Sequence, residues 1–129
     1  MIIIHSSAMV EALAGREADA DLIDALQGSI HAPHLLDVEV LSTLRGLALG
    51  GKLSTAAAEQ ARADYLALRI ARYEIKGIAE RIWELRHNYT SYDASYLALA
   101  EALETPLYTC DAKLDGGGHD ADVQVFPRS

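Results

Sequence analysis

The chain of 129 residues is half apolar and carries a formal net charge of −8. Its length fits one domain, residues 1–129, which can bury a core without disulfide bonds or a structural metal. The acidic balance excludes a passive basic platform for nucleic acid, because such binding depends on Lys and Arg side chains that neutralise phosphates. A nucleic-acid substrate would need a bound metal or a partner protein to offset the repulsion.

The single cysteine, Cys110, cannot form an intrachain disulfide bond, which suits a reducing compartment. The apolar opening Met1–Ile4 is too short for the core of a signal peptide, and no apolar run approaches the about 18 residues of a membrane span. We therefore expect a cytoplasmic protein that does not enter a membrane.

The first half of the chain predicts two strands and three helices, from β-branched runs and from apolar residues that recur every three or four positions. A strand that leads directly into a helix is the first half of a βαβ unit. The elements are the strand Met1–Ile4, a helix capped by Ser7 and ended by Gly15, the helix Asp19–Gln27, the strand Ser29–Ala32 before Pro33, and the helix Leu35–Leu49.

The second half predicts three more helices and three more strands by the same criteria. These elements are a helix from the cap Ser54 to about Leu68, the strand Ile70–Ile75, the helix Gly77–His87, the helix Tyr92–Leu103 capped by Ser91, the strand Leu107–Cys110, and a last strand at Val123–Phe126. Strands that alternate with helices predict an α/β fold: a central parallel sheet of about four to five strands, covered by helices on both faces.

Two candidate site residues fall where predicted strands end. His5 follows the first strand and Asp111 follows the strand Leu107–Cys110. In an open parallel sheet, ligands gather outside the carboxyl ends of the strands, so we expect these residues to lie near one another. Thr109 and Asp111 have the same parity, which points a hydroxyl and a carboxylate to one side. A purely structural role is equally open for Asp111, because aspartate commonly begins a turn.

Two further acids are predicted on helices. Asp93 lies in the first turn after the cap Ser91, and Glu39 lies at the edge of the apolar stripe of the helix Leu35–Leu49. Free N–H groups at a helix start explain an aspartate without any catalytic role, and a solvated glutamate is common at a helix edge. Taken with Asp111, however, these acids form a set of three carboxylates from distant segments, which is typical of a site for Mg²⁺ or Mn²⁺.

Four segments together resemble the PIN-domain family, specifically the VapC toxins of VapBC toxin–antitoxin pairs. The segments are Ile2–Glu11, Pro33–Val40, Asn88–Tyr96 and Thr109–Asp111, and their order and spacing are more specific than any one of them. The resemblance implies a three-layer α/β/α fold and a Mg²⁺- or Mn²⁺-dependent endoribonuclease that cleaves RNA. It also implies a homodimer and inhibition by a VapB-type antitoxin, whose C-terminal segment enters the acidic site.

Carried over by position, the resemblance implies that Glu39, Asp93 and Asp111 are the catalytic, metal-binding acids. It implies supporting roles for the hydroxyls of Ser6, Ser7 and Thr109, with Asp115 as a less diagnostic helper. These positions are read from the matching segments of the chain.

His5 is a departure, because the family has an aspartate at the end of the first strand. A histidine at this position removes one hard oxygen ligand, although its nitrogen is a candidate ligand for a softer metal. We therefore expect an endoribonuclease whose activity is impaired by His5. The alternatives are a catalytically inactive PIN-fold module that keeps antitoxin or RNA binding and, more remotely, a nuclease directed at DNA.

Overall fold

A five-stranded parallel sheet forms the centre of the computed structural model, which describes all residues Met1–Ser129. The strands are β1 (Ile2–Ile4), β2 (Ile30–Pro33), β3 (Ile70–Tyr73), β4 (Leu107–Thr109) and β5 (Val123–Val125), in the order β3-β2-β1-β4-β5. The central strand β1 is buried throughout because it pairs with β2 on one side and β4 on the other. The predicted parallel α/β architecture is confirmed.

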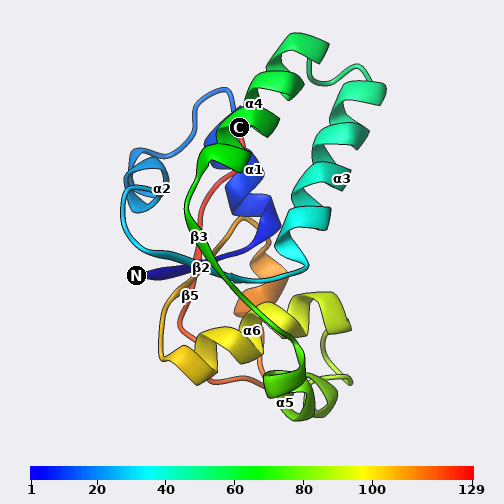
Figure 1. Cartoon of the computed structure of the whole chain (residues 1–129). Coiled ribbons are helices and arrows are strands. Elements are labelled where there is room, and N and C mark those ends of the chain that lie inside the picture. Colours follow the sequence, from blue (N-terminus) through cyan, green and yellow to red (C-terminus); the bar gives the residue numbers. More distant parts are fainter.

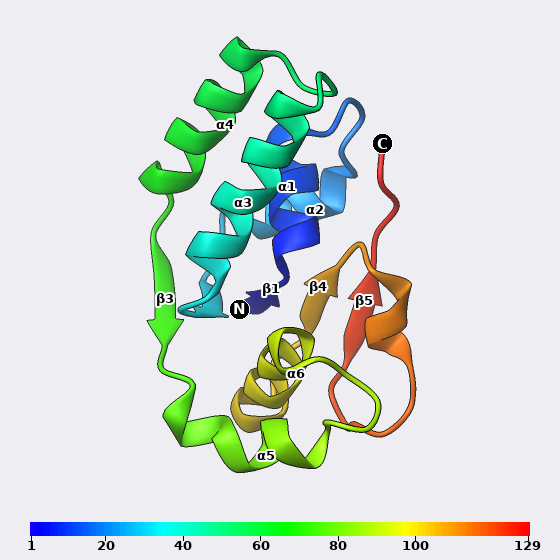
Figure 2. The same cartoon turned by 90° about the vertical axis from the view of Figure 1, so that its right-hand side faces the viewer.

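Helices cover both faces of this sheet (Figure 1). They are α1 (Ser6–Ala14), α2 (Ala20–Ala25), α3 (Leu36–Leu49), α4 (Thr55–Ala67), α5 (Ala79–Glu84) and α6 (Ser91–Leu103), with short 3₁₀ helices η1 (Lys76–Ile78) and η2 (Ala112–Asp115). Figure 2 shows α5 and α6 below the strands and α1 to α4 above them, which confirms the three layers. None of the helices is both long and apolar enough to cross a membrane.

Several element boundaries differ from the sequence prediction. The predicted helix Gly77–His87 divides into η1 and α5 and ends at Glu84. Pro33 belongs to β2 instead of ending the strand before it; as the last residue of the strand it still pairs with Tyr73, while the next N–H, from His34, donates to the Tyr73 carbonyl. A proline is tolerated there because a strand end needs one ladder donor fewer.

Helix α6 contains the longest uninterrupted run of buried residues in the domain. Every residue from Ala94 to Ala100 is buried, including Tyr96 and Leu97 with no exposed surface. A helix that is apolar on all sides must be enclosed, and α6 contacts β1, β2 and β4 as well as α5. The residues at its N-terminal end are therefore held by the core itself.

An ion pair joins α5 to the C-terminal half of α6. Arg81 donates two hydrogen bonds, of 2.8 and 3.0 Å, to the carboxylate of Glu101, whose side chain is only 14% exposed. The same carboxylate accepts the N–H of Asp120 at 2.7 Å. The hydrogen bonds from Arg81 lower the pKa of Glu101 below its ordinary value of 4.5, against the opposing effect of burial.

We expect Glu101→Gln to lower the free energy of unfolding at pH 7 by about 1.5–3 kcal/mol, the usual contribution of a hydrogen bond to a charged group. Because the folded-state pKa of Glu101 is lowered, its contribution is complete above pH 4.5 and is lost as the pH falls through the folded value. Denaturant unfolding between pH 7 and pH 3 should therefore show the parent and the variant converging in acid. A matched control is Glu59→Gln, which removes an exposed ion pair with Arg62 and should change little. A difference independent of pH would contradict the assignment.

Candidate functional site

His5 lies at the junction between β1 and α1 and serves as the N-cap of α1. The helix begins at Ser6, and the Nδ1 atom of His5 accepts the N–H of Ser7 at 3.3 Å. The sequence prediction that Ser7 caps this helix is therefore wrong. The imidazole nitrogen occupies the place that a carboxylate or hydroxyl oxygen usually takes at a cap, so the histidine performs the capping role itself.

Ser7 and Thr109 instead tie the end of β1 to the end of β4. The Oγ atom of Ser7 accepts the N–H of Cys110 at 2.9 Å and lies 3.2 Å from the Oγ1 atom of Thr109. Thr109 is fully buried, and its Oγ1 atom accepts the N–H of Asp111 at 3.0 Å. The two hydroxyls predicted to support the site are thus next to each other, and both also lie within hydrogen-bonding distance of Nδ1 of His5.

Asp93 approaches His5 from the opposite face of the sheet. Helix α6 begins at Ser91, and its cap is Thr90, whose Oγ1 atom accepts the N–H of Asp93 at 3.2 Å, so the predicted cap Ser91 is also wrong. The Asp93 Oδ1 atom lies 3.2 Å from Nε2 of His5. The exposed fractions of the two side chains are 7% for His5 and 22% for Asp93. His5 therefore points into the site.

Tyr96 connects Glu39 to this pair, a role that the sequence analysis did not assign. Its hydroxyl donates to the Oε1 atom of Glu39 at 2.5 Å, and its ring meets the imidazole of His5 edge to face, with the centroids 4.7 Å apart. Burial, and then the hydrogen bond to Glu39, raise the pKa of Tyr96 well above its ordinary value. The phenol therefore remains a donor at every physiological pH. The available signal was its position three residues after Asp93, which places both on one face of α6.

Asp37 lies in the same first turn of α3 as Glu39 but faces the other way. Arg72 donates to both oxygens of Asp37, at 2.9 to 3.1 Å, and the hydroxyl of Tyr65 donates to it at 2.5 Å. Burial alone would raise the pKa of Asp37, but these hydrogen bonds outweigh it and lower the pKa. This cluster fixes the first turn of α3 and therefore the direction in which Glu39 leaves the helix.

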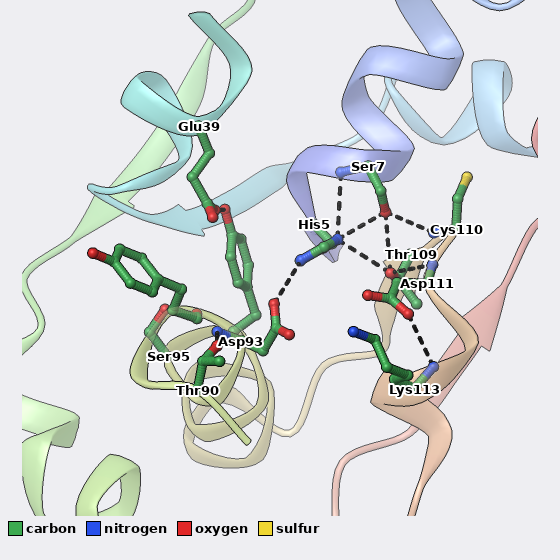
Figure 3. A network of polar contacts seen from close by, with 12 residues as sticks. His5, Ser7, Glu39, Thr90, Asp93, Ser95, Thr109, Cys110, Asp111 and Lys113 are labelled. Atoms are coloured by element: carbon green, nitrogen blue, oxygen red, sulfur yellow. Dashed lines mark hydrogen bonds and ion pairs between the residues drawn. The ribbon is translucent and has the colours of Figure 1, made fainter. Parts of the chain in front are cut away.

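Asp111 begins a turn and also faces the site. Its Oδ1 atom accepts the N–H of Lys113 at 3.0 Å, which makes it the cap of η2. Figure 3 shows its carboxylate beside Thr109, facing the space around His5 and Asp93, with the Lys113 side chain extending toward the same space. The structural and functional interpretations of Asp111 are thus compatible.

The two remaining predicted helpers differ in their surroundings. Ser6 is buried as the first residue of α1, and its side chain reaches Tyr96, where it acts to lower the pKa of the phenol against the larger effect of burial. Asp115 is exposed at the end of η2. Its charge acts on Tyr89, whose pKa is raised first by burial and then by Asp115. Asp115 does not belong to the hydrogen-bonded network around His5.

The acids are of the right chemical type to bind a divalent metal ion, but in this structure their side chains are too far apart to bind one together. Carboxylate oxygens from Glu39, Asp93 and Asp111 are the donors that Mg²⁺ and Mn²⁺ prefer. However, no three His, Cys, Asp or Glu side chains lie close enough together to hold one ion. The close contact that does form joins Nε2 of His5 to Asp93. Four ionisable side chains therefore surround one space (Figure 3): the imidazole of His5 and the carboxylates of Glu39, Asp93 and Asp111.

Comparison with known proteins gives this arrangement its context. The PIN domain family model matches residues 2–117. Ribonuclease VapC9 of Mycobacterium tuberculosis is 42% identical over 129 residues, which cover 99% of this chain and 100% of VapC9. Ribonuclease VapC12 of the same organism is 34% identical over 127 residues, covering 97% of this chain and 98% of VapC12.

A solved structure agrees with the fold. The crystal structure of PAE2754 from Pyrobaculum aerophilum superposes with a TM-score of 0.66 at 25% sequence identity, covering 88% of this chain and 81% of that chain. Since the family model spans most of the chain and VapC ribonucleases match it along nearly its whole length, the chain belongs to the PIN-domain family of VapC ribonucleases.

Proposed function

We propose that this chain is the endoribonuclease toxin of a type II toxin–antitoxin pair and cleaves RNA phosphodiester bonds in the cytoplasm. Membership of the VapC ribonuclease family supports the reaction class. The observation that carries the site assignment is that Glu39, Asp93 and Asp111, from α3, α6 and the end of β4, face one space beside the carboxyl end of β1. A catalytic site in a parallel sheet is expected at that edge.

We further propose that these three carboxylates would hold Mg²⁺ or Mn²⁺. When bound, such an ion offsets the repulsion between the acids and the RNA phosphate and activates water. The protein's own part is positional. Tyr96 holds one oxygen of Glu39, while Ser7 and Thr109 keep the ends of β1 and β4 together. The side chain of Lys113 extends toward the same space (Figure 3), where its cation would attract an RNA phosphate.

We propose that His5 lowers the rate of RNA cleavage, because it supplies no carboxylate at the end of β1. The contact between its Nε2 atom and Asp93 supports the attenuation, since that contact engages an oxygen needed by the metal. A second candidate function, a catalytically inactive module that keeps antitoxin or RNA binding, is favoured by the same contact and by the absence of a three-residue metal cluster. Cleavage assays separate the two.

We expect His5→Asp to cleave RNA about 10–100-fold faster than the parent chain with Mg²⁺, the factor by which even the hydrogen-bond partners of metal ligands typically change metal affinity or activity. Mg²⁺ should also raise the melting temperature of His5→Asp more than that of the parent, because only the variant gains a ligand for the ion. Cleavage of a labelled RNA, with Mg²⁺, Mn²⁺ or a chelator, and thermal unfolding measure the two effects.

The double variant His5→Asp with Asp93→Asn is the matched control and should lose the gained activity. Equal Mg²⁺-dependent cleavage by the parent and His5→Asp would show that position 5 is not the missing ligand. No cleavage by either protein, with antitoxin binding intact, would favour the inactive module.

A groove between α3 and α4 supports the proposed binding of a VapB-type antitoxin. It is lined by Leu41, Leu44, Arg45, Ala48, Thr55, Ala58, Glu59 and Arg62. Leu41 is 42% exposed and Leu49, at the end of the same helix, is 71% exposed. An apolar floor with charged margins suits an amphipathic helix. Since Glu39 also lies on α3, a chain that continues beyond such a helix would reach the acidic site with a basic side chain.

Leu41→Asp should weaken antitoxin binding at least about tenfold, because it places a charge in the apolar part of the groove. The matched control is Trp83→Asp, which charges an exposed apolar residue of α5 that lies outside the groove. Isothermal titration with the antitoxin's C-terminal peptide measures both. Equal loss of affinity in the two variants would place the partner elsewhere.

We also propose that the chain forms a homodimer, as the family resemblance implies. Sedimentation velocity over a hundredfold range of protein concentration should show a dimer that dissociates only on dilution. A monomer at every concentration would contradict the proposal.

A further inference from the structure

The Nδ1 edge of the His5 ring faces only groups that can give it a proton. The N–H of Ser7 donates to Nδ1 at 3.3 Å, and a backbone N–H cannot accept in return. The hydroxyls of Ser7 and Thr109, at 2.7 and 3.2 Å from the same atom, can each donate to it as well. Nδ1 is therefore an acceptor, which places a ring proton on Nε2.

The Nε2 edge faces an acceptor. Asp93 Oδ1 lies 3.2 Å away, and a carboxylate offers only lone pairs. A nitrogen that donates a hydrogen has no lone pair for a metal, so metal binding at Nε2 would require the proton to move to Nδ1. A proton on Nδ1 would point at the N–H of Ser7, so this hydrogen bond, which caps α1, would be lost. Rotation of the ring is opposed by the buried Tyr96 ring against it, since His5 is itself 6% exposed.

We propose that His5 is a positioning residue and not a metal ligand: through one fixed tautomer it caps α1 and donates from Nε2 to Asp93. The inference deepens the proposed function and rests on it only in taking Asp93 as a member of the metal-binding set. The chain's preference between metals is then decided by oxygen ligands alone. Soft ions gain nothing from the imidazole, and a hard ion must compete with the Nε2 hydrogen for Asp93.

The direct test is the nitrogen NMR spectrum of the full-length chain labelled with ¹⁵N-histidine, recorded at one pH. The chain has five histidines, and His5→Asn identifies the resonances of His5 by their loss. The expected pattern is an unprotonated Nδ1 and a protonated Nε2. Adding the diamagnetic ions Zn²⁺ or Mg²⁺ should not convert His5 to the opposite tautomer. Asp93→Asn should shift the Nε2 resonance and leave the pattern of Nδ1 unchanged.

Calorimetric titration with Mn²⁺ supplies the second readout. His5→Asn keeps an oxygen acceptor at the cap position and removes the Nε2 hydrogen that competes for Asp93, so it should bind Mn²⁺ at least as tightly as the parent chain. His5→Asp adds the carboxylate and should bind about tenfold more tightly or better. Thermal unfolding of each variant checks that the fold is retained before its affinity is compared.

A protonated Nδ1, a direct metal-induced shift of Nε2, or Mn²⁺ binding that is weakened by His5→Asn would overturn the inference. Its failure is distinguishable from failure of the proposed function. If the tautomer and the affinities are as expected but His5→Asp cleaves no RNA, the inference stands and the proposed activity does not. If His5→Asp cleaves RNA while His5 of the parent ligates the metal, the reverse holds.

Discussion

The site depends on the point in the sheet where the chain order reverses, between β1 and β4. Both strands end there, and the chain leaves the sheet with backbone N–H groups that no longer have ladder partners, a cost that buried backbone must avoid. Three side chains accept these groups: Ser7 accepts from Cys110, Thr109 accepts from Asp111, and His5 accepts from Ser7 itself. These three side chains therefore have a structural role, because they replace the hydrogen bonds that the strands lose at their ends. The proposed chemistry uses the same group of side chains.

The acids are tolerated in this region because of where they lie on their elements. Glu39 and Asp93 are in the first turns of α3 and α6, and Asp111 caps the short helix η2. At these positions unpaired N–H groups and the helix dipole favour negative charge. Part of the stabilisation of each carboxylate thus comes from its own helix start. Arginine is used instead at Asp37, which faces away from the site.

Much of the architecture could be read from the sequence, whereas the contacts of the site could not. Short β-branched runs and apolar periodicity identified the strands and the main helices, and these features are local. The caps were misassigned because serine is the commoner capping residue, yet the helices are capped by His5, two positions before Ser7, and by Thr90, one position before Ser91. The contacts of His5 with Asp93, and of Tyr96 with Glu39, join residues 88 and 57 positions apart. Such pairs depend on how α6 packs, which single-residue preferences do not encode.

Because α6 is buried, the geometry of the proposed site depends on how the hydrophobic core packs. Asp93 sits at one end of a rod whose body, from Ala94 to Ala100, is enclosed by sheet and helices on all sides. Close-packed protein interiors have low compressibility and transmit strain. A cavity or an extra methylene near Leu97 would therefore translate the rod and carry Asp93 with it. Substitutions far from the acids can in this way lower the activity while the protein stays folded. Selection can therefore change the toxicity of the protein without changing its stability.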